Sequence, residues 1–301
     1  MGGHLTSKRN LSGLLRLRDG MLCSRTMPGL KKHDKIRVKT DPPRSILHVR
    51  PSELEGVARY WPSPDLESFV EDYWVARWDR PETAETVPQP CMHIVLQAGA
   101  SEVIGISRTR FTRVLAGSGR MLGAKFRPGA FRTLVDLPAW RYTDKSLPLT
   151  TVFGPRAVTL EARALASDDD RESLVVVESF LRDFGPSSNE SIMLVGCIVA
   201  RIAGDRGITR VDQLMHEFGI GSRSLQRLFR EYVGIGPKWV VQSLRLLEAA
   251  DRATRGEVTD WSDLALELGY ADQAHFIRDF KKLVGRSPVD YTRSLGYSSS
   301  R

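Results

Sequence analysis

The chain has 301 residues and a formal net charge of +8, and 41% of its residues are hydrophobic, so it has room for two globular units. Its longest apolar run, residues 192–200, is far shorter than the roughly 20 residues that cross a bilayer, and no apolar core follows the basic start, so we expect neither a membrane span nor a secretory signal. The three cysteines, Cys23, Cys91 and Cys197, are odd in number and far apart, which indicates a reducing compartment without a disulfide framework.

The positive charge is concentrated at the start of the chain. The first 50 residues hold twelve Lys and Arg against three Asp, a net +9, which leaves −1 for the other 251 residues. This segment has no sustained apolar period and ends in Asp41-Pro42-Pro43. We expect residues 1–45 to form a disordered basic tail. Any affinity of the rest of the chain for an anionic partner must therefore come from where its charges lie.

Residues 46–155 have the pattern of antiparallel β structure. Short alternating or apolar runs at 93–97, 102–106 and 121–126 are separated by Pro and Gly turns, and residues 66–74 mix strand and aromatic character. These runs predict a β-rich domain.

The same segment contains few candidates for a catalytic, metal or cofactor site. His93 stands alone on its strand, so we expect a packed or hydrogen-bonded histidine and no metal site. Residues 117–119 are Gly-Ser-Gly without the Gly-Lys-Ser/Thr of a phosphate loop, so no cofactor is expected. Four tryptophans either line an apolar pocket or pack in the core and at its edges, and core packing is favoured; they are Trp61, Trp74, Trp78 and Trp140.

Residues 156–205 are helical in texture. Apolar residues recur at helical spacing in three stretches that begin near Ala157, Leu174 and Ile192, separated by an Asp run and a Gly-Pro-Ser-Ser segment. One interpretation is a set of helices that buttress the β domain.

The last third of the chain contains a repeat. Residues 214–237 and 264–288 match at an offset of 50 in their first part and 51 in their second, so one residue is inserted between the two parts. A copy this short exposes an apolar face that it cannot cover alone. The two copies must therefore share one packed helical unit.

Each copy predicts a helix, a tight turn and a second helix. The first helix has apolar residues four positions apart, a glycine suited to the left-handed conformation follows it, and a Ser or Asp stands where it can cap the second helix. In the two copies these residues are Leu214 and Leu264, Phe218 and Leu268, Gly219 and Gly269, Ser222 and Asp272. The inward stripe of the second helices consists of Leu225, Leu228 and Phe229, and of Phe276 and Phe280.

The outward faces of the two second helices are basic and polar. Arginine offers a donor fork to guanine, glutamine can pair with adenine, and lysine suits phosphate, so such a face is typical of a helix that reads the major groove of DNA. The alternative is that these are ordinary solvated helix faces. Because two such faces occur in a repeated helix-turn-helix unit, we favour DNA binding over this alternative. The candidate DNA-binding residues are Arg223, Gln226, Arg227, Arg230, Gln273, His275, Arg278, Lys281 and Lys282.

A spacer joins the two units. Residues 239–253 alternate apolar and polar groups at helical spacing and would extend about 22 Å at 1.5 Å per residue. Asp260 or Ser262 can cap the helix that follows. A rigid spacer of this kind fixes the distance between the two reading helices, so they can enter successive major grooves.

Three segments together resemble the tandem helix-turn-helix domain of AraC/XylS-type transcription regulators: SRSLQRLFREYVG, WVVQSLRLLEAADR and ALELGYADQAHFIRDFKKLVGRSPVDY. The resemblance covers roughly the last hundred residues. It implies that Arg223, Gln226 and Arg227 face DNA in the first unit, and that Gln273, Ala274, His275 and Arg278 do so in the second. The chain departs from the family pattern at Met215 and Gly236, which are packing positions rather than reading positions.

The segments LGAKFRPGAF and SLPLTTVFG resemble the N-terminal sensor domain of one AraC-type subgroup. This resemblance implies a small β-barrel or cupin-like fold for residues 46–155. It also implies self-association through the helices of residues 156–205, which we favour slightly over a buttress.

The expected protein is an α+β chain with a β-barrel or cupin-like sensor domain, connecting helices and an all-α domain with two helix-turn-helix units. The expected ranges are 1–45, 46–155, 156–205 and 206–296. We expect a cytoplasmic, nucleoid-associated bacterial regulator that is not an enzyme, needs no cofactor and binds double-stranded DNA, with a small-molecule effector, RNA polymerase and a second copy of the chain as further partners. Its effector, its operator and whether it activates or represses are not encoded in these patterns.

Two other functions stay open from the sequence. One is a DNA-binding protein that is constitutive or regulated by another protein, with an N-terminal domain that senses no ligand. The other is a DNA-modifying enzyme, which would need a reactive cysteine in a basic pocket; Cys91, between Pro90 and Met92, is a poor candidate.

Overall fold

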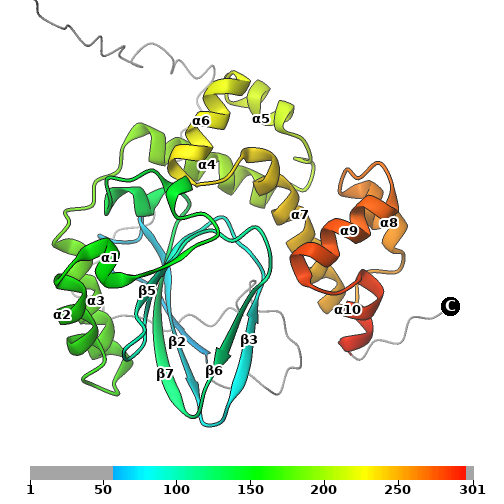
Figure 1. Cartoon of the computed structure of the whole chain (residues 1–301). Helices are drawn as coiled ribbons and strands as arrows, with labels where there is room; N and C mark the ends of the chain where they lie inside the picture. Colours follow the sequence, from blue (N-terminus) through cyan, green and yellow to red (C-terminus); the bar gives the residue numbers. More distant parts are fainter. Residues whose placement is uncertain (1–56, 296–301) are drawn as a thin grey trace, which may run out of the picture.

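The computed structural model describes residues 57–295, so the basic tail expected at residues 1–45 lies outside the described part. In Figure 1 the strands occupy the lower part of the molecule, and the helices cover its left side, its top and its right side. The strands are β1 (Val57–Tyr60), β2 (Val70–Trp78), β3 (Glu82–Thr86), β4 (His93–Leu96), β5 (Glu102–Ile104), β6 (Phe111–Leu115), β7 (Gly119–Phe126) and β8 (Ser146–Pro148).

The strands form two antiparallel sheets. Six of them pair in the order β1-β2-β7-β4-β5-β8, and β3 pairs with β6 as a separate two-stranded ribbon. The expected strands at residues 93–97, 102–106 and 121–126 are confirmed as β4, β5 and β7. Residues 64–69 form a turn instead of the first half of a strand, and β2 begins at Val70. The described residues contain no closed barrel, so the expected barrel or cupin-like closure is not confirmed.

The two faces of the six-stranded sheet pack against different parts of the molecule. One face presents residues such as Tyr73, Ile94 and Phe126 to the main core, and the helices α2 and α3 lie on this side. The other face carries Trp78 and Met121, which pack in a smaller cluster with Leu115 of the ribbon.

The helices follow the sheet. They are the 3-10 turns η1 (Ala130–Thr133) and η2 (Ala139–Arg141), then α1 (Leu149–Phe153), α2 (Arg156–Ala164), α3 (Asp170–Arg182), α4 (Glu190–Gly204), α5 (Val211–Glu217), α6 (Ser222–Tyr232), α7 (Pro237–Thr254), α8 (Trp261–Glu267), α9 (Gln273–Val284) and α10 (Pro288–Ser294). None of the helices within residues 57–295 combines the length and the apolar character that a bilayer crossing requires.

The helices expected at residues 156–205 do not form one layer. Helices α2 and α3 pack on the sheet, where Asp170 accepts hydrogen bonds from Tyr60, Arg77 and Arg120. Helix α4 instead contacts α6 and α7. Part of this segment is therefore a buttress for the sheet, and part belongs structurally to the helices that follow.

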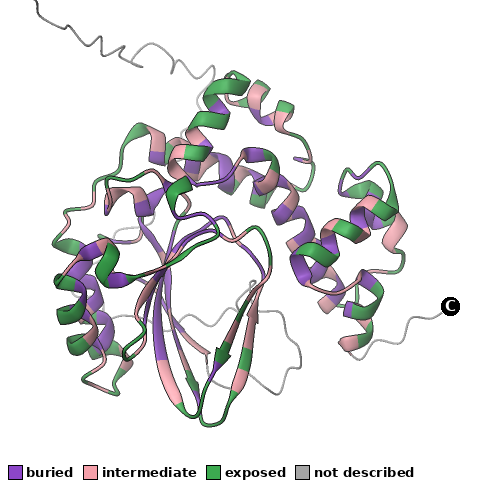
Figure 2. Ribbon diagram, in the orientation of Figure 1, coloured by how far each residue is buried: buried purple, intermediate pink, exposed green. Residues whose placement is uncertain are grey.

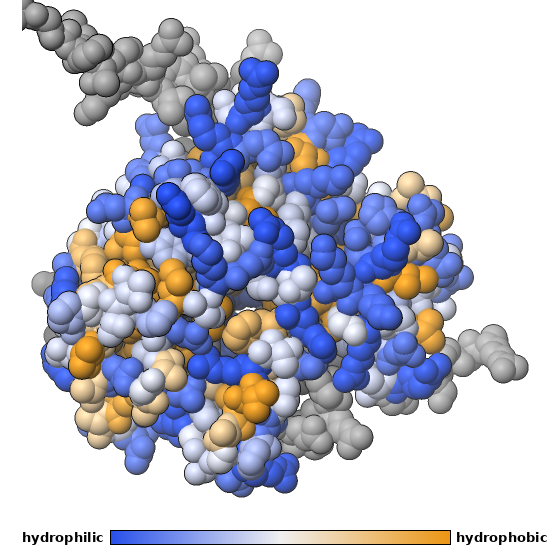
Figure 3. Space-filling model, viewed as in Figure 1, coloured by the Kyte–Doolittle hydropathy of each residue, from blue (hydrophilic) through white to orange (hydrophobic). Residues whose placement is uncertain are grey.

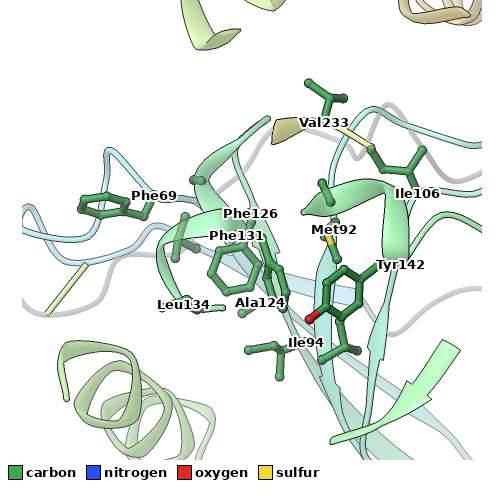
Figure 4. Close-up of a cluster of buried hydrophobic side chains, with 14 of the residues drawn as sticks. Phe69, Met92, Ile94, Ile106, Ala124, Phe126, Phe131, Leu134, Tyr142 and Val233 are labelled. Atoms are coloured by element: carbon green, nitrogen blue, oxygen red, sulfur yellow. The ribbon is translucent and has the colours of Figure 1, made fainter. Parts of the chain in front are cut away.

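One apolar core runs through most of the molecule. It extends from the sheet through α2, α3 and α4 into α5, α6 and the first half of α7. In the close-up of Figure 4, Val233, just after α6, lies beside Ile106, just after β5. A separate core lies among the second half of α7 and helices α8, α9 and α10. Figure 2 shows buried residues along the whole length of α7, which contributes to both cores.

Candidate nucleic-acid interface

Helices α5 and α6 form the first predicted unit. Leu214, Leu225 and Phe229 are 0% exposed, so the expected apolar stripes do face inward. The turn between the helices depends on Gly219, whose φ of +61° is the left-handed conformation that a side chain disfavours. The predicted cap at Ser222 is wrong: Gly221 holds the N-cap position, and Ser222 is already the first residue of the helix.

Helices α8 and α9 form the second unit. Gly269 has a φ of +83°, and the Asp272 carboxylate accepts a hydrogen bond from the His275 amide at 2.7 Å, so the predicted turn and cap are both confirmed. Phe276 and Phe280 are 0% exposed and pack with Trp261. The Asp260 side chain accepts from the Ser262 amide and caps α8, as expected for one of the two candidates.

The spacer predicted at residues 239–253 is the continuous helix α7. It runs for 18 residues, or about 27 Å at 1.5 Å per residue. Its first half contributes Val240 and Val241 to the main core, and its second half contributes Leu246 and Ala249 to the core of the second unit. Because both ends are packed, α7 holds the two reading helices, α6 and α9, at a fixed separation.

The predicted DNA-binding side chains lie on the outer faces of α6 and α9. Eight of the nine residues are exposed: Arg223, Gln226, Arg227, Arg230, Gln273, Arg278, Lys281 and Lys282. The molecular surface over α6 in Figure 3 is mostly hydrophilic, in keeping with this placement. His275 is less free, because its Nε2 lies 3.2 Å from a carboxylate oxygen of Asp279 and its ring packs edge-on against Tyr270.

The arginines that read bases in this interpretation form no ion pair with a carboxylate of the described residues. Within residues 57–295, many arginines pair with carboxylates, for example Arg201 with Glu217 at 2.6 Å and Arg252 with Glu267 at 2.8 Å. In the same part of the chain, no such ion pair involves Arg223, Arg227 or Arg278. Because these arginines have no carboxylate partner, their N–H donors remain available to an anionic ligand.

The β-rich domain packs directly against the end of the first reading helix. The Thr143 hydroxyl donates a buried hydrogen bond to the Gly234 carbonyl at 2.7 Å, and the Arg132 guanidinium lies 3.3 Å from the Glu231 carboxylate. A Cβ on Gly234 would stand only 2.9 Å from the Ala139 carbonyl oxygen, so only glycine allows this approach. None of these contacts was predicted from the sequence, because their partners lie about 90 residues apart.

The second reading helix also contacts the β-rich domain. The Arg110 guanidinium, which is paired with Glu85 of β3 at 2.7 Å, lies against Gly285 at the end of α9. Val87, which follows β3, is buried in the core of the second unit. A positive group beside a helix C-terminus is favourable, because carbonyl oxygens there carry a partial negative charge.

His93 is packed and hydrogen-bonded, as expected. The Trp74 indole N–H points to its Nδ1 at 3.4 Å, and the Cys91 sulfur lies 3.5 Å from its Nε2. Burial lowers the pKa of His93 to about 4 and raises the pKa of the Cys91 thiol to about 12. A thiol with a raised pKa is a poor nucleophile, which argues against a cysteine enzyme here. Within residues 57–295, no three His, Cys, Asp or Glu side chains are grouped so that they could hold a metal ion.

Three of the four tryptophans, Trp74, Trp78 and Trp140, do not share one pocket. Trp78 is buried and Trp74 packs against the same small cluster, with its indole directly over Gly123, where a Cβ would stand 2.0 Å from the ring. Trp140 lies far along the chain, beside α6, and is 36% exposed. Core and edge packing accounts for two of them, and Trp140 has a different environment.

Two helix-turn-helix units, joined by one helix and presenting two basic faces, define a DNA-binding domain. Comparison with known families agrees, because a family described as a helix-turn-helix domain matches residues 214–294. A second family, described as a domain of unknown function (DUF6597), matches residues 58–148.

The similar curated proteins are transcription regulators. The chain is 32% identical over 82 residues to the "Probable transcription factor PqrA" of Proteus vulgaris, and 27% identical over 79 residues to the "Virulence regulon transcriptional activator VirF" of Yersinia enterocolitica. These matches cover 27% and 26% of this chain, and 66% and 29% of the two relatives. The C-terminal domain, residues 214–294, is therefore a helix-turn-helix domain of the AraC/XylS type.

Among solved structures, ToxT from Vibrio cholerae is similar with a TM-score of 0.40 and 13% sequence identity, over 75% of this chain and 98% of ToxT. A similarity at this level does not define the arrangement of the domains in this protein.

Proposed function

We propose that this regulator reads a specific DNA site with both helix-turn-helix units of one chain, α6 and α9 each entering a major groove. The observation that supports this most is the equivalent placement of Arg227 and Arg278 in the two units. Both are exposed, and neither has a carboxylate partner within the described residues. Helix α7 holds the two helices apart, so the two contacted groove segments should lie about one helical turn, or about 10 base pairs, from each other.

The test uses the full-length protein. Its preferred site is first selected from random duplexes, and the affinities of Arg227→Ala and Arg278→Ala are then measured by fluorescence anisotropy. Each variant should lose about 1–3 kcal/mol for the selected site and relax preference at one or two base pairs. Lys281→Ala, which removes a charge suited to phosphate, should weaken all sequences about equally. Unchanged affinity in both arginine variants would refute the assignment of α6 and α9 to the groove.

A spacing test separates two reading units from one. Inserting 5 base pairs between the two protected segments rotates one of them to the opposite side of the duplex. High-affinity binding should then be lost, because α7 is packed at both ends and cannot follow the rotation. Retained affinity would show that only one unit reads DNA.

The proposal includes control of DNA binding by a small ligand of the sensor domain. Two contacts support it: the segment 129–143 meets the end of α6, and the β3–β6 ribbon meets the end of α9 through Arg110. A ligand that moved the ribbon or this segment would change the relative position of the reading helices.

A metabolite screen by thermal shift, followed by anisotropy with each ligand found, tests this control. A ligand that raises the melting temperature and changes operator affinity supports it. Identical affinity with every stabilising ligand would favour the alternative, a constitutive or protein-regulated DNA-binding protein. A non-enzymatic role is part of the same proposal.

A further inference from the structure

A second basic site lies where the sensor domain meets the first reading helix. Trp140 of η2 has two guanidinium groups over its ring: the central carbon of Arg141 lies 4.7 Å from the ring centroid, and that of Arg230 lies 4.8 Å from it. A guanidinium group over an indole ring is attracted by the negative face of the ring. One exposed indole thus holds together a positive charge of the sensor domain and a positive charge of α6.

The acidic residues that neighbour these arginines along the chain pair with other arginines. Glu231, next to Arg230, lies 3.3 Å from Arg132, and Asp144, three residues after Arg141, accepts hydrogen bonds from Arg108. Within residues 57–295, no carboxylate forms an ion pair with Arg141 or Arg230. Two guanidinium groups gathered without a neutralising carboxylate repel each other, and the bound anion that best relieves this repulsion is a phosphate, which matches the arginine fork.

The position of this pair fits the edge of a DNA groove. Arg223, Arg227 and Arg230 lie four and three residues apart, so they share one stripe of α6 that is about 10 Å long. The major groove is about 12 Å wide. When the first turns of α6 contact base edges, Arg230 at the far end of the stripe therefore lies near the phosphates that border the groove. Arg141 lies beside it, on the same indole.

The sensor domain cannot shift easily relative to this stripe. The Thr143 hydroxyl holds the Gly234 carbonyl at 2.7 Å, and there is no space for a side chain between Gly234 and Ala139. The two arginines are therefore presented with a fixed geometry, which lowers the entropy lost on binding.

We propose that Trp140 and Arg141 of the sensor domain, together with Arg230, form a binding site for a DNA backbone phosphate that flanks the base pairs read by α6. This inference rests on the proposed function and deepens it, because it makes the sensor domain part of the DNA-binding surface. The site positions the protein on the duplex and carries no sequence preference of its own.

The experiment uses the full-length protein and its selected duplex, with affinity measured at several salt concentrations. Arg141→Gln removes one phosphate contact, so it should weaken binding to all sequences alike and reduce the slope of log affinity against log salt by about 0.9. Trp140→Leu should act in the same direction, because the two guanidinium groups lose their common support. Arg163→Gln, which removes an exposed charge on α2, is the matched control and should leave the slope unchanged.

Three other results would each overturn the inference. Tighter binding by Arg141→Gln or Trp140→Leu would mean that the sensor domain withholds Arg230 from DNA. Unchanged affinity and slope in both variants, while Arg227→Ala still loses the operator, would remove this site and leave the proposed function standing. A wild-type protein that selects no sequence would refute the proposed function, and this site with it.

Discussion

Replacing Arg245 by alanine is expected to destabilise the protein by about 3–4 kcal/mol. Arg245 lies in α7 and is 2% exposed, and burial lowers its pKa below the ordinary range of arginine. Its Nη2 donates to the carbonyl of Ile202 in the last turn of α4, and its Nη1 lies 2.8 Å from the carboxylate of Glu248. This side chain therefore joins the spacer helix to the end of α4.

The magnitude has two parts. A hydrogen bond from a charged group contributes about 1.5–3 kcal/mol, and the two CH₂ groups of the stem that alanine lacks contribute about 1.6 kcal/mol at about 0.8 kcal/mol each. The desolvation cost of the wild-type charge offsets part of this sum. Glu248 keeps an ion-pair partner in Arg245→Ala, because Nε of Arg206 lies 2.5 Å from its other carboxylate oxygen. Arg245→Met keeps the stem contacts, so it should lose only about 1–2 kcal/mol.

Urea unfolding followed by far-ultraviolet circular dichroism measures both variants, with equal m-values as the condition for comparing midpoints. Arg163→Ala on the exposed face of α2 is the control and should change stability by less than about 0.5 kcal/mol. The account of Arg245 is wrong if the alanine variant stays within about 1 kcal/mol of the wild type. It is also wrong if methionine costs as much as alanine.

Two further predictions concern pH. Burial lowers the pKa of His93 to about 4 in the folded protein, whereas the pKa of a histidine in the unfolded chain is about 6.5. Between these values only the unfolded state gains a proton, so the free energy of unfolding should fall by about 2 kcal/mol from pH 7.5 to pH 5. Urea titrations of His93→Asn at both pH values should show a smaller loss, and an unchanged loss would contradict the assignment. Burial acts to raise the pKa of Asp170, but hydrogen bonds from Arg77 and Tyr60 outweigh it and lower the pKa below its ordinary 3.8. Asp170 therefore stabilises the fold above about pH 4 and loses that effect as the pH falls through its lowered pKa. Asp170→Asn should be less stable than the wild type at pH 7, and the free energies of unfolding of the two proteins should converge in acid. A difference that stays constant with pH would mean that the charge of Asp170 contributes nothing.

The reading helices could be predicted because their signals are local. Apolar residues at helical spacing and the glycine at each turn fix α6 and α9 within a few residues, and the outward side chains follow from the same period. The prediction that Ser222 caps α6 was wrong because Gly221 adopts the extended N-cap conformation. The helix therefore begins at Ser222, one residue before the predicted start.

The contacts of the β-rich domain with the two reading helices could not be predicted in the same way. Strands β3 and β6 leave the main sheet to pair with each other, although the strands around them have similar patterns. The contact between Trp140 and Arg230 spans 90 residues, and no period in the sequence connects them. An exposed tryptophan beside an arginine in a turn was a usable signal, but it did not indicate which distant side chain would complete the site.

The continuity of the main apolar core limits how this protein can be divided. Leu225, Phe229 and Val233 of the first unit pack in the same core as Phe131 and Ala139 of the β-rich domain, whereas the second unit has a core of its own. A fragment cut at residue 205 would expose an apolar surface on its first unit and would tend to aggregate. A chimaera that carries a foreign sensor domain should therefore keep residues 129–143 with the reading head, so that the engineered junction does not pass through this core.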